Sequence, residues 1–409
     1  MASARVMLYS HDTFGLGHIR RTRAIANAIE AAYEGTSILI ASGSPLTGSF
    51  HFRPGIDFVR FPGVIKHDDG GYASANLHLS LEETTALRAT IIRSAAEAFR
   101  PDVFIADKEP VGFCGELLPT LDLLERLGTH CVAGLRDVLD ETAVVRREWS
   151  HNGTVRALTH YYDSILVYGL EEFYAPLSGV PLPSTVHERI RYTGYLRRSV
   201  PGGPAAVRYP KSTRGPFILV TTGGGGDGDG LIDWIISAYE ADPSISLPAV
   251  LVLGPYMSRA RRRTVLDRID ALPKLEAITF DPKLERLLNR ATAVVAMGGY
   301  NTFCEILSFD KPALIVPRSR PRLEQTIRAD RAQQMGLLQM LLDPQETGSG
   351  ERDPLVMAAA LEALGRQSRP STRALPGLLD GLDNVVAALA PVIAEDAVAR
   401  AVASGSPGP

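Results

Sequence analysis

The chain has 409 residues, of which 45% are hydrophobic and 22% charged, and its formal net charge is −3 at pH 7. This length exceeds one ordinary hydrophobic core and predicts two domains. The small negative charge argues against general nucleic-acid binding, which needs a strongly basic face.

In the first half, short apolar runs alternate with helical patterns. Strands are expected at 6–10, 37–41, 58–61, 103–107, 130–135, 164–168 and 190–193. Helical patterns separate several of them, at 19–32, 81–99 and 115–127. This alternation predicts a parallel sheet that is covered on both faces.

A segment rich in proline, glycine and basic residues, 197–216, follows and is typical of a domain linker. The alternation then restarts. Strands are expected at 217–221, 249–253, 276–280, 293–297 and 313–316, and helices at 231–239, 259–269, 284–289, 302–309 and 323–335. After a polar loop, two more helical patterns cover 355–364 and 378–403. The fold class expected is α/β, with two Rossmann-like doubly wound domains that face a cleft.

The cysteines and the N-terminus indicate a cytoplasmic protein. Cys114, Cys131 and Cys304 show no metal-ligand spacing and are expected to be reduced thiols. The first residues enter a strand without a signal-peptide pattern. The apolar run 384–394 is shorter than the about 20 residues that span a bilayer. Peripheral contact with the inner face of the membrane is left open.

The first glycine-rich turn, 13–21, ends a strand, where open parallel sheets bind ligands. Gly15 and Gly17 begin a dinucleotide fingerprint, but Arg20 occupies the place of its third glycine, and no acid ends the second strand. Nicotinamide binding is therefore excluded, as is a P-loop. His18, Arg20, Arg21 and Arg23 crowd the helix start, where cations oppose the helix dipole. Either a bound anion offsets this repulsion, or the arginines point to solvent and His18 is a polar turn residue.

The second turn, 222–230, contains Gly223, Gly224 and Gly225, whose backbone N–H groups can approach a phosphate. Asp227 and Asp229 follow, in a pattern that looks like a metal motif. We favour the other interpretation, in which Asp229 is the N-cap of the next helix, and we expect no metal ion.

The third turn contains Gly298 and Gly299, and Thr302 with Glu305 matches a capping box. Glu305 is either that cap or a ligand-binding carboxylate. The next strand ends in Arg318, Arg320 and Arg322, followed by Glu324 and Gln325. Arginines suit a diphosphate, and carboxylate and amide oxygens suit vicinal hydroxyls. Together these groups predict a nucleotide-sugar pocket.

Residues 280–336 resemble the C-terminal donor-binding domain of glycosyltransferase family 28, the family of the lipid II N-acetylglucosaminyl transferase and the galactolipid synthases. Gly299-Tyr300-Asn301-Thr302-Phe303-Cys304-Glu305 matches its Gly-Ala-x-Thr-x-x-Glu pattern. A Pro-Ala-x-x-x-Pro strand at 312–317 and a polar corner at 323–325 follow at the family's spacing. Tyr300 replaces a small residue, and Glu324 replaces an amide of the lipid II enzyme.

The resemblance implies the GT-B fold of two Rossmann-like domains. Its expected parts are an acceptor-side domain at 1–200, a linker at 201–215, a donor-binding domain at 216–375, helices at 376–403 that return to the first domain, and a disordered tail at 404–409. It further implies that Glu305 binds the ribose of the donor, that Gln325 faces the donor sugar, and that His18 is the catalytic base. Asp107, Glu109 and Asp137, at strand ends of the first domain, either orient the acceptor or are solvated loop charges. Gly15, Gly17 and Arg20 of the first turn are also expected on the acceptor side.

The expected activity is inverting, metal-independent transfer of a hexose from a UDP-sugar to an acceptor hydroxyl, in cell-envelope or polysaccharide biosynthesis. The acceptor is expected to be a saccharide, a lipid-linked molecule or a small molecule, and no cofactor is expected. A hydrolase or epimerase of the same fold is the first alternative. A sugar-nucleotide-binding protein without turnover is the second.

Overall fold

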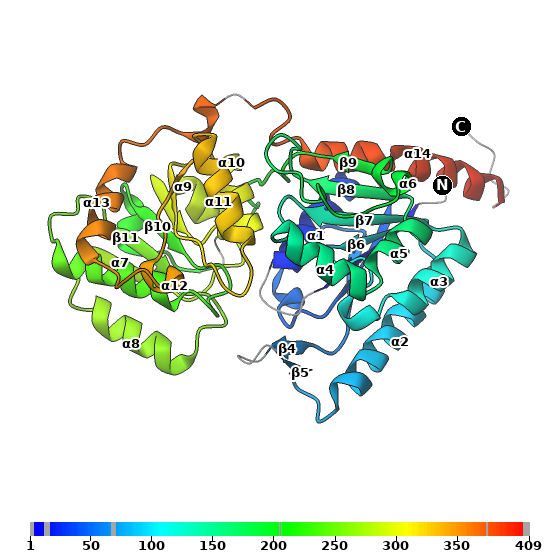
Figure 1. Ribbon diagram of the computed structural model, residues 1–409, viewed down its shortest axis with the longest axis horizontal. Coiled ribbons are helices and arrows are strands. Elements are labelled where there is room, and N and C mark those ends of the chain that lie inside the picture. The colour runs from blue at the N-terminus through cyan, green and yellow to red at the C-terminus, as the bar shows by residue number, and fades with distance from the viewer. Residues whose placement is uncertain are drawn as a thin grey trace. The chain divides into compact units, whose positions relative to one another are not determined.

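The computed structural model describes residues 4–11, 17–66, 71–203, 205, 207–373 and 375–403. The chain forms two compact units, the first from residues 1–196 with 377–409 and the second from residues 197–376. The expected linker segment therefore belongs to the second unit. Each unit contains one parallel sheet with helices around it, so the predicted α/β class with two Rossmann-like units is confirmed (Figure 1). That the two units face a cleft stays a prediction.

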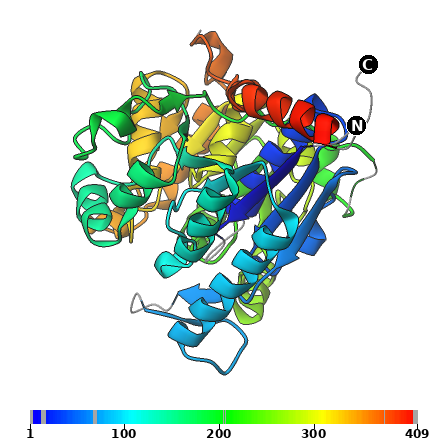
Figure 2. The ribbon, with the colours of Figure 1, turned by 90° about the vertical axis from the view of Figure 1, so that its right-hand side faces the viewer.

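The first unit contains a seven-stranded sheet of order β3-β2-β1-β6-β7-β8-β9, in which every neighbouring pair is parallel (Figure 2). Its strands are β1 Arg5–Ser10, β2 Ser37–Ser42, β3 Ile56–Arg60, β6 Val103–Asp107, β7 His130–Arg136, β8 Ser164–Tyr168 and β9 Ile190–Tyr192. Its helices are α1 Gly17–Ala32, α2 Leu81–Phe99, α3 Leu118–Leu127, α4 Thr142–His151, α5 Thr154–His160, α6 Ser184–His187 and α14 Gly381–Ala403. Strand β6 is buried along its whole length, as expected for a parallel sheet with two covered faces.

A short antiparallel hairpin, β4 Val64–Lys66 and β5 Tyr72–Ser74, lies between β3 and α2. The sequence analysis did not predict it. Helix α2 begins at a capping box, in which Ser80 and Glu83 satisfy each other's backbone N–H groups.

Helix α14, drawn in red in Figures 1 and 2, belongs to the first unit. The backbone N–H of Tyr195 donates to the carbonyl of Leu378 at 2.8 Å, and the side chain of Asn384 donates to the carbonyl of Thr193 at 2.8 Å. Gly194 has a φ of 86°, and a Cβ there would lie 2.3 Å from the carbonyl oxygen of Gly377. This close approach of two backbones requires glycine and holds the returning chain against the end of β9.

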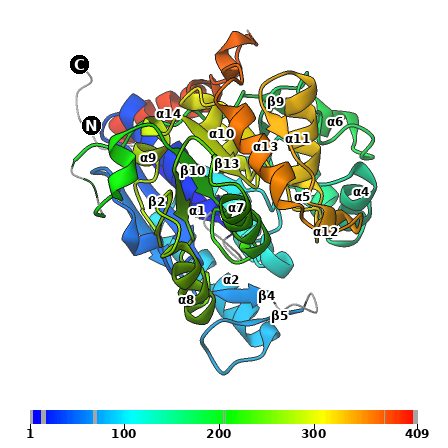
Figure 3. The same ribbon diagram turned by 90° about the vertical axis from the view of Figure 1, so that its left-hand side faces the viewer.

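The second unit contains a six-stranded parallel sheet of order β12-β11-β10-β13-β14-β15 (Figure 3). Its strands are β10 Ile218–Thr221, β11 Ala249–Val252, β12 Leu275–Ile278, β13 Ala293–Ala296, β14 Ala313–Ile315 and β15 Gln339–Met340. Its helices are α7 Asp229–Ala241, α8 Arg259–Ile269, α9 Glu285–Arg290, α10 Tyr300–Ser308, α11 Glu324–Gln334, α12 Pro344–Thr347 and α13 Pro354–Leu364. The central strands β10 and β13 are buried throughout and form the core with the apolar face of α7.

Candidate functional site

Both sheets have a topological switch point, where the chain order of the strands reverses. In the first sheet it lies between β1 and β6, and in the second between β10 and β13. Ligands of open parallel sheets bind outside the carboxyl ends of such strand pairs. The predicted site residues therefore form two groups, one for each switch point.

At the first switch point, His18 and Asp107 form a close pair. The register places Ser10 of β1 beside Asp107 of β6, and His18 is the second residue of α1. His18 Nδ1 lies 2.6 Å from Asp107 Oδ2. Arg21, one turn further along α1, donates from Nε and Nη2 to the two carboxylate oxygens, each at 2.6 Å. The exposed fractions of the His18, Asp107 and Arg21 side chains are 12%, 3% and 2%.

The ionisation of this triad follows from its burial and its charges. Burial raises the pKa of Asp107, but Arg21 and His18 outweigh it, so the pKa of this carboxyl is held well below its usual range. Burial lowers the pKa of His18, and the bond to Asp107 only partly offsets this effect. At neutral pH Asp107 is therefore ionised and His18 neutral.

The same contacts decide the tautomer of His18. An ionised carboxylate only accepts hydrogen bonds, so His18 Nδ1 carries the proton and donates to Asp107. The lone pair of the neutral ring is then on Nε2, where it can take a proton. Arg21 Nη2 also lies 3.3 Å from His18 Nδ1, but both atoms are donors there, and we assign no hydrogen bond.

Arg21 corrects the sequence interpretation of the basic helix start. The carboxylate of Asp107, 86 residues away, neutralises Arg21, so neither an external anion nor solvent is its partner. Arg20 is half-buried on the same helix. Gly17 is the first residue of α1, and Gly15 lies outside the described residues.

Glu109 and Asp137 are the two other acidic residues predicted for the acceptor side. Glu109 is partly exposed and pairs with Lys108 Nζ at 2.8 Å. Asp107, Lys108 and Glu109 form a tight γ-turn. The Glu109 N–H donates to the Asp107 carbonyl, and Lys108, the central residue, has a φ of 71°. Asp137 is fully buried and accepts a hydrogen bond from the Tyr195 hydroxyl at 2.9 Å, which ties β7 to the chain after β9.

At the second switch point, the glycine-rich turn 222–228 follows β10. Gly223 has a φ of 73° and is exposed, Gly224 is half-buried, and Gly225 has a φ of 82°. A Cβ on Gly225 would lie 2.1 Å from the carbonyl oxygen of Leu253, so only glycine fits there. The turn thus packs backbone to backbone against the end of β11.

The turn after β13 contains Gly298 and Gly299. Gly298 has a φ of 81°, and a Cβ there would lie 2.7 Å from Ile315 Cγ2. Gly299 is the N-cap of α10, with no side-chain cap hydrogen bond. The helix therefore begins at Tyr300, and Thr302 and Glu305 are its third and sixth residues. The capping-box interpretation is wrong because the helix begins before Thr302.

Glu305 is fully buried, and Thr302 has an exposed fraction of 8%. Arg328 of α11 is buried next to the start of α10. Its guanidinium donates to the carbonyl of Gly298 at 3.0 Å and lies 5.7 Å from the centre of the Tyr300 ring. Sequence analysis missed Arg328, since its place among the polar residues of α11 shows no pattern.

Arg318 connects the glycine-rich turn after β10 to the start of α11. Its guanidinium donates to Asp227 Oδ2 at 2.6 Å and to Glu324 Oε1 at 3.0 Å. The backbone N–H of Arg318 donates to Gln325 Oε1 at 3.3 Å. Arg318 thus bridges the glycine-rich turn and the first turn of α11, with its charge already matched by carboxylates.

Asp229 is the first residue of α7, not its N-cap, which is Gly228. Its carboxylate lies 3.3 Å from Arg261 Nε. Among the described residues, no three histidine, cysteine, aspartate or glutamate side chains gather in a way that could hold a metal ion. Within the same part of the chain, no helix is long and apolar enough to cross a membrane.

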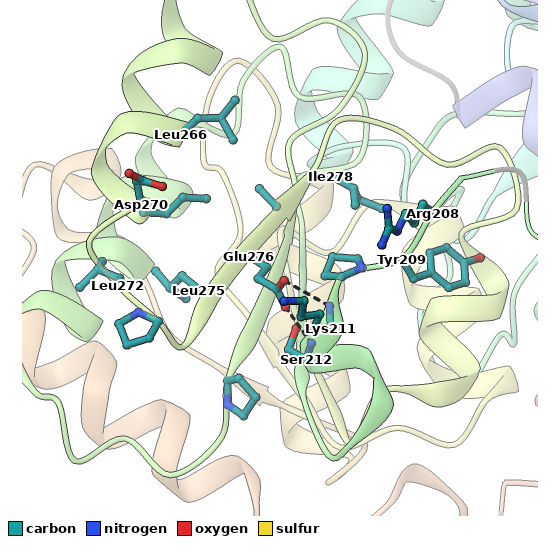
Figure 4. Close-up of a pocket in the computed structure, with 15 residues that line it drawn as sticks. Arg208, Tyr209, Lys211, Ser212, Leu266, Asp270, Leu272, Leu275, Glu276 and Ile278 are labelled. Carbon is teal, nitrogen blue, oxygen red and sulfur yellow. Dashed lines mark hydrogen bonds between the residues drawn. The ribbon is translucent and has the colours of Figure 1, made fainter.

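A cavity of about 870 Å³ lies elsewhere in the second unit, along the edge strand β12 (Figure 4). Pro210, Leu266, Leu272 and Leu275 contribute to its lining, and the carboxylate of Glu276 accepts from the backbone N–H groups of the 211–212 segment. Strand β12 is the outer strand of the sheet. Among the residues described as lining this cavity, none belongs to the predicted site.

Comparisons with known proteins agree with the fold described above. CalG4, the calicheamicin glycosyltransferase, is 18% identical with a TM-score of 0.56, and the match covers 100% of both chains. MurG from Acinetobacter baumannii is 14% identical, with a TM-score of 0.55 over 95% of this chain and 99% of that chain. A protein described as a UDP-N-acetylglucosamine 2-epimerase, from Listeria monocytogenes, is 13% identical, with a TM-score of 0.60 over 97% and 98% of the two chains. The fold is therefore that of the GT-B glycosyltransferases.

Residues 218–347 match the sequence model of the glycosyltransferase family 28 C-terminal domain. This range contains the 280–336 segment on which the sequence resemblance was based, and the resemblance to family 28 is confirmed for the second unit. A search of curated proteins found no match to the chain.

Proposed function

We propose that the protein transfers a hexose from a nucleotide diphosphate sugar, with UDP as the expected nucleotide, to an acceptor hydroxyl with inversion. The observation that carries this proposal is the His18–Asp107 pair at the first switch point. His18 Nε2 takes the proton of the acceptor hydroxyl while the hydroxyl oxygen attacks the anomeric carbon. The bond from that carbon to the diphosphate breaks in the same step, and the diphosphate leaves with the electron pair.

Asp107 is a positioning residue in this mechanism. It keeps the proton on His18 Nδ1 and favours the imidazolium that forms when Nε2 accepts a proton. Arg21 in turn keeps Asp107 ionised, because the buried guanidinium binds both carboxylate oxygens.

We assign donor binding to the second switch point, which the family 28 match supports. The backbone N–H groups of the glycine turns and the N-termini of α7, α10 and α11 supply a positive field for the diphosphate, and the reaction needs no metal ion. The donor-binding residues that we propose are Gly223, Gly224, Gly225, Gly298, Gly299, Thr302, Glu305, Arg318, Glu324 and Gln325. Within this set Arg318 positions the glycine-rich turn and the start of α11, because its guanidinium already binds Asp227 and Glu324.

The donor screen and the base variant test the proposal together. A donor at 100 times its Kd adds about 2.7 kcal/mol to the free energy of unfolding, so thermal shifts with UDP, GDP and TDP sugars identify it. We expect His18→Ala to lower kcat by about 10²-fold to 10⁴-fold with donor affinity nearly unchanged. The exposed His51→Ala is the matched control. Near-normal turnover of His18→Ala would remove the base from the proposal.

Glu305→Gln tests the donor half. If Glu305 accepts two ribose hydroxyls, the variant loses about 2–4 kcal/mol of donor binding, roughly 30-fold to 1,000-fold in Kd. Since Glu305 is fully buried, the neighbouring side chains must move before ribose reaches it. Calorimetric donor titrations are compared with those of the exposed Glu351→Gln. Unchanged donor affinity beside a lowered melting temperature would make Glu305 a structural residue.

A nucleotide-sugar hydrolase or epimerase is the second candidate, because a protein described as an epimerase shares the fold. Incubation with donor and no acceptor separates the reactions. A hydrolase releases free sugar, an epimerase returns isomerised donor, and a transferase leaves the donor largely intact. Donor binding without turnover over a wide acceptor panel would instead indicate a sugar-nucleotide-binding protein.

A further inference from the structure

A continuous series of rings leads away from the base. The His18 and His11 ring centres lie 5.3 Å apart, His11 and Phe113 6.1 Å, and Phe113 and Tyr72 5.0 Å. His11 follows β1, Phe113 lies after β6, and Tyr72 belongs to the β4–β5 hairpin. The side chains of His11 and Phe113 are buried, with exposed fractions of 7% and 5%, whereas Tyr72 is exposed at 36%. The rings therefore form one continuous row of contacts from the hairpin to His18, and Tyr72 is its exposed end.

The charge behind this row of rings is cancelled. The Arg88 guanidinium lies 5.6 Å from the centre of the Phe113 ring, and Arg88 Nε lies 2.5 Å from a Glu116 carboxylate oxygen. Both charged side chains are fully buried. Because Glu116 matches the charge of Arg88, this ion pair adds no net positive charge beside the Phe113 ring.

The same network decides the tautomer of His11. The Tyr9 hydroxyl has one proton, which it donates to Glu116 Oε1 at 2.5 Å. Its oxygen can then only accept, and His11 Nδ1 lies 3.3 Å from it. His11 Nδ1 therefore carries the proton, and the lone pair is on Nε2. Burial lowers the pKa of His11 well below its usual range, which keeps the ring neutral beside His18.

Two residues with positive φ angles flank Phe113. Gly112 has a φ of 71°, and a Cβ there would lie 2.8 Å from Leu117 Cγ. Cys114, a residue with a side chain, has a φ of 49°. Such conformations cost about 1–3 kcal/mol for residues with a Cβ and persist where the surrounding structure holds them. Both neighbours of Phe113 thus have positive φ angles.

We propose that Tyr72, Phe113 and His11 form the acceptor-binding wall, and that the acceptor is an uncharged molecule with a hydroxyl next to an apolar ring. This inference rests on the proposed function. The hydroxyl lies at His18, and the apolar ring packs against Tyr72 and, once the side chains that cover it move, against Phe113, since aromatic side chains favour apolar rings in offset or edge contact. His11 Nε2 accepts a hydrogen bond from a second polar group of the acceptor. Sites of this kind combine aromatic lining with a few placed polar atoms.

Equilibrium binding of two probes to the full chain tests the wall. The probes are 2-naphthol, a hydroxyl on an apolar ring, and myo-inositol, a polyhydroxylated ring without an apolar body. We expect 2-naphthol to bind more tightly. Tyr72→Ala and Phe113→Leu should each weaken 2-naphthol binding by about 2-fold to 12-fold. Phe52→Leu is the matched control, because Phe52 is a half-buried aromatic residue of the same unit that pairs with Phe58 instead.

The outcomes separate the wall from the proposed function. Unchanged 2-naphthol binding in Tyr72→Ala, whose half-exposed side chain does not form the core, would overturn the wall, as would tighter binding of myo-inositol. If sugar transfer is observed and requires His18 in that case, the proposed function stands without the wall. If the wall variants lose 2-naphthol binding but no donor is turned over with any acceptor, the wall stands and the proposed function falls.

Discussion

Replacing Asp107 by asparagine changes one atom and separates two roles of this carboxylate. In the native chain its two oxygens accept three hydrogen bonds of 2.6 Å, two from Arg21 and one from His18. The asparagine side chain has one acceptor oxygen and one N–H donor group. If the oxygen keeps its hydrogen bond from Arg21 Nε, the amide N–H₂ faces both His18 Nδ1 and Arg21 Nη2. The proton of His18 then moves to Nε2, and the base has no lone pair where it needs one.

We expect Asp107→Asn to change both kcat and the free energy of unfolding. Loss of a hydrogen-bonded carboxylate that fixes a catalytic histidine costs about 10⁴-fold in kcat where it has been measured for such triads, and we expect about 10²-fold to 10⁴-fold here. Removing one partner of a buried ion pair costs about 3–5 kcal/mol, because Arg21 keeps a buried and poorly matched charge. Asp107→Asn should therefore lose both turnover and stability in the first unit.

The assay is kcat at saturating donor and acceptor from pH 5 to 8, with urea unfolding followed in parallel. In the proposed mechanism neutral His18 is the active form, so the rate should rise with pH through the pKa of His18, which burial lowers from 6.5. Asp107 raises that pKa, so its removal shifts the acid limb of the profile to lower pH. Arg21→Lys is the control, since it weakens the ion pair but leaves the His18–Asp107 bond. Near-native kcat with an unshifted acid limb in Asp107→Asn would refute the assigned tautomer.

Two further predictions concern the backbone and the returning chain. Gly223→Ala should lower the free energy of unfolding by about 1–2 kcal/mol, the cost of an alanine in a left-handed conformation. Gly225→Ala should cost more, because the new Cβ would lie 2.1 Å from a carbonyl oxygen. Urea unfolding of the two variants compares these costs directly. Tyr195→Phe should cost about 1–3 kcal/mol, because it removes a hydrogen bond from the buried carboxylate of Asp137; an unchanged urea midpoint would contradict this.

The two sheets were predictable because their strands are short apolar runs between helices of ordinary length. The strand β6 was expected at 103–107 and is found at Val103–Asp107, where every side chain is buried. The hairpin β4–β5 was missed because its strands have only three residues each. A period of two is barely visible over three residues.

The helix starts were harder to predict than the helices. Thr302 and Glu305 have the spacing of a capping box, yet α10 begins at Tyr300 after a glycine N-cap. Asp229 is the first residue of α7, again after a glycine N-cap. In both places a glycine turn leads directly into the helix, and the polar residue that looked like the cap lies inside it. A local motif predicts a helix start only when the preceding turn is also known.

The pairing of Asp107 with His18 and Arg21 depends on strand order. Asp107 is 89 positions from His18 and 86 from Arg21, and no local pattern joins it to either residue. Once β1 is known to lie beside β6, the register brings the end of one strand next to the end of the other. Arg88 and Glu116 were missed for the same reason, since a buried ion pair between α2 and the chain before α3 has no signature in either segment.

Within the proposed function, the residues around the proposed base His18 favour transfer over hydrolysis. A neutral histidine held by a carboxylate can take a proton from water as well as from an alcohol. The dyad alone therefore does not choose between the two reactions. The ring series from His11 to Tyr72 does, because water gains little from an aromatic surface, whereas an acceptor with an apolar ring buries area on it. A hydrolase has no use for such a surface, and its presence at the base is the physical reason to search for an apolar, hydroxylated acceptor first.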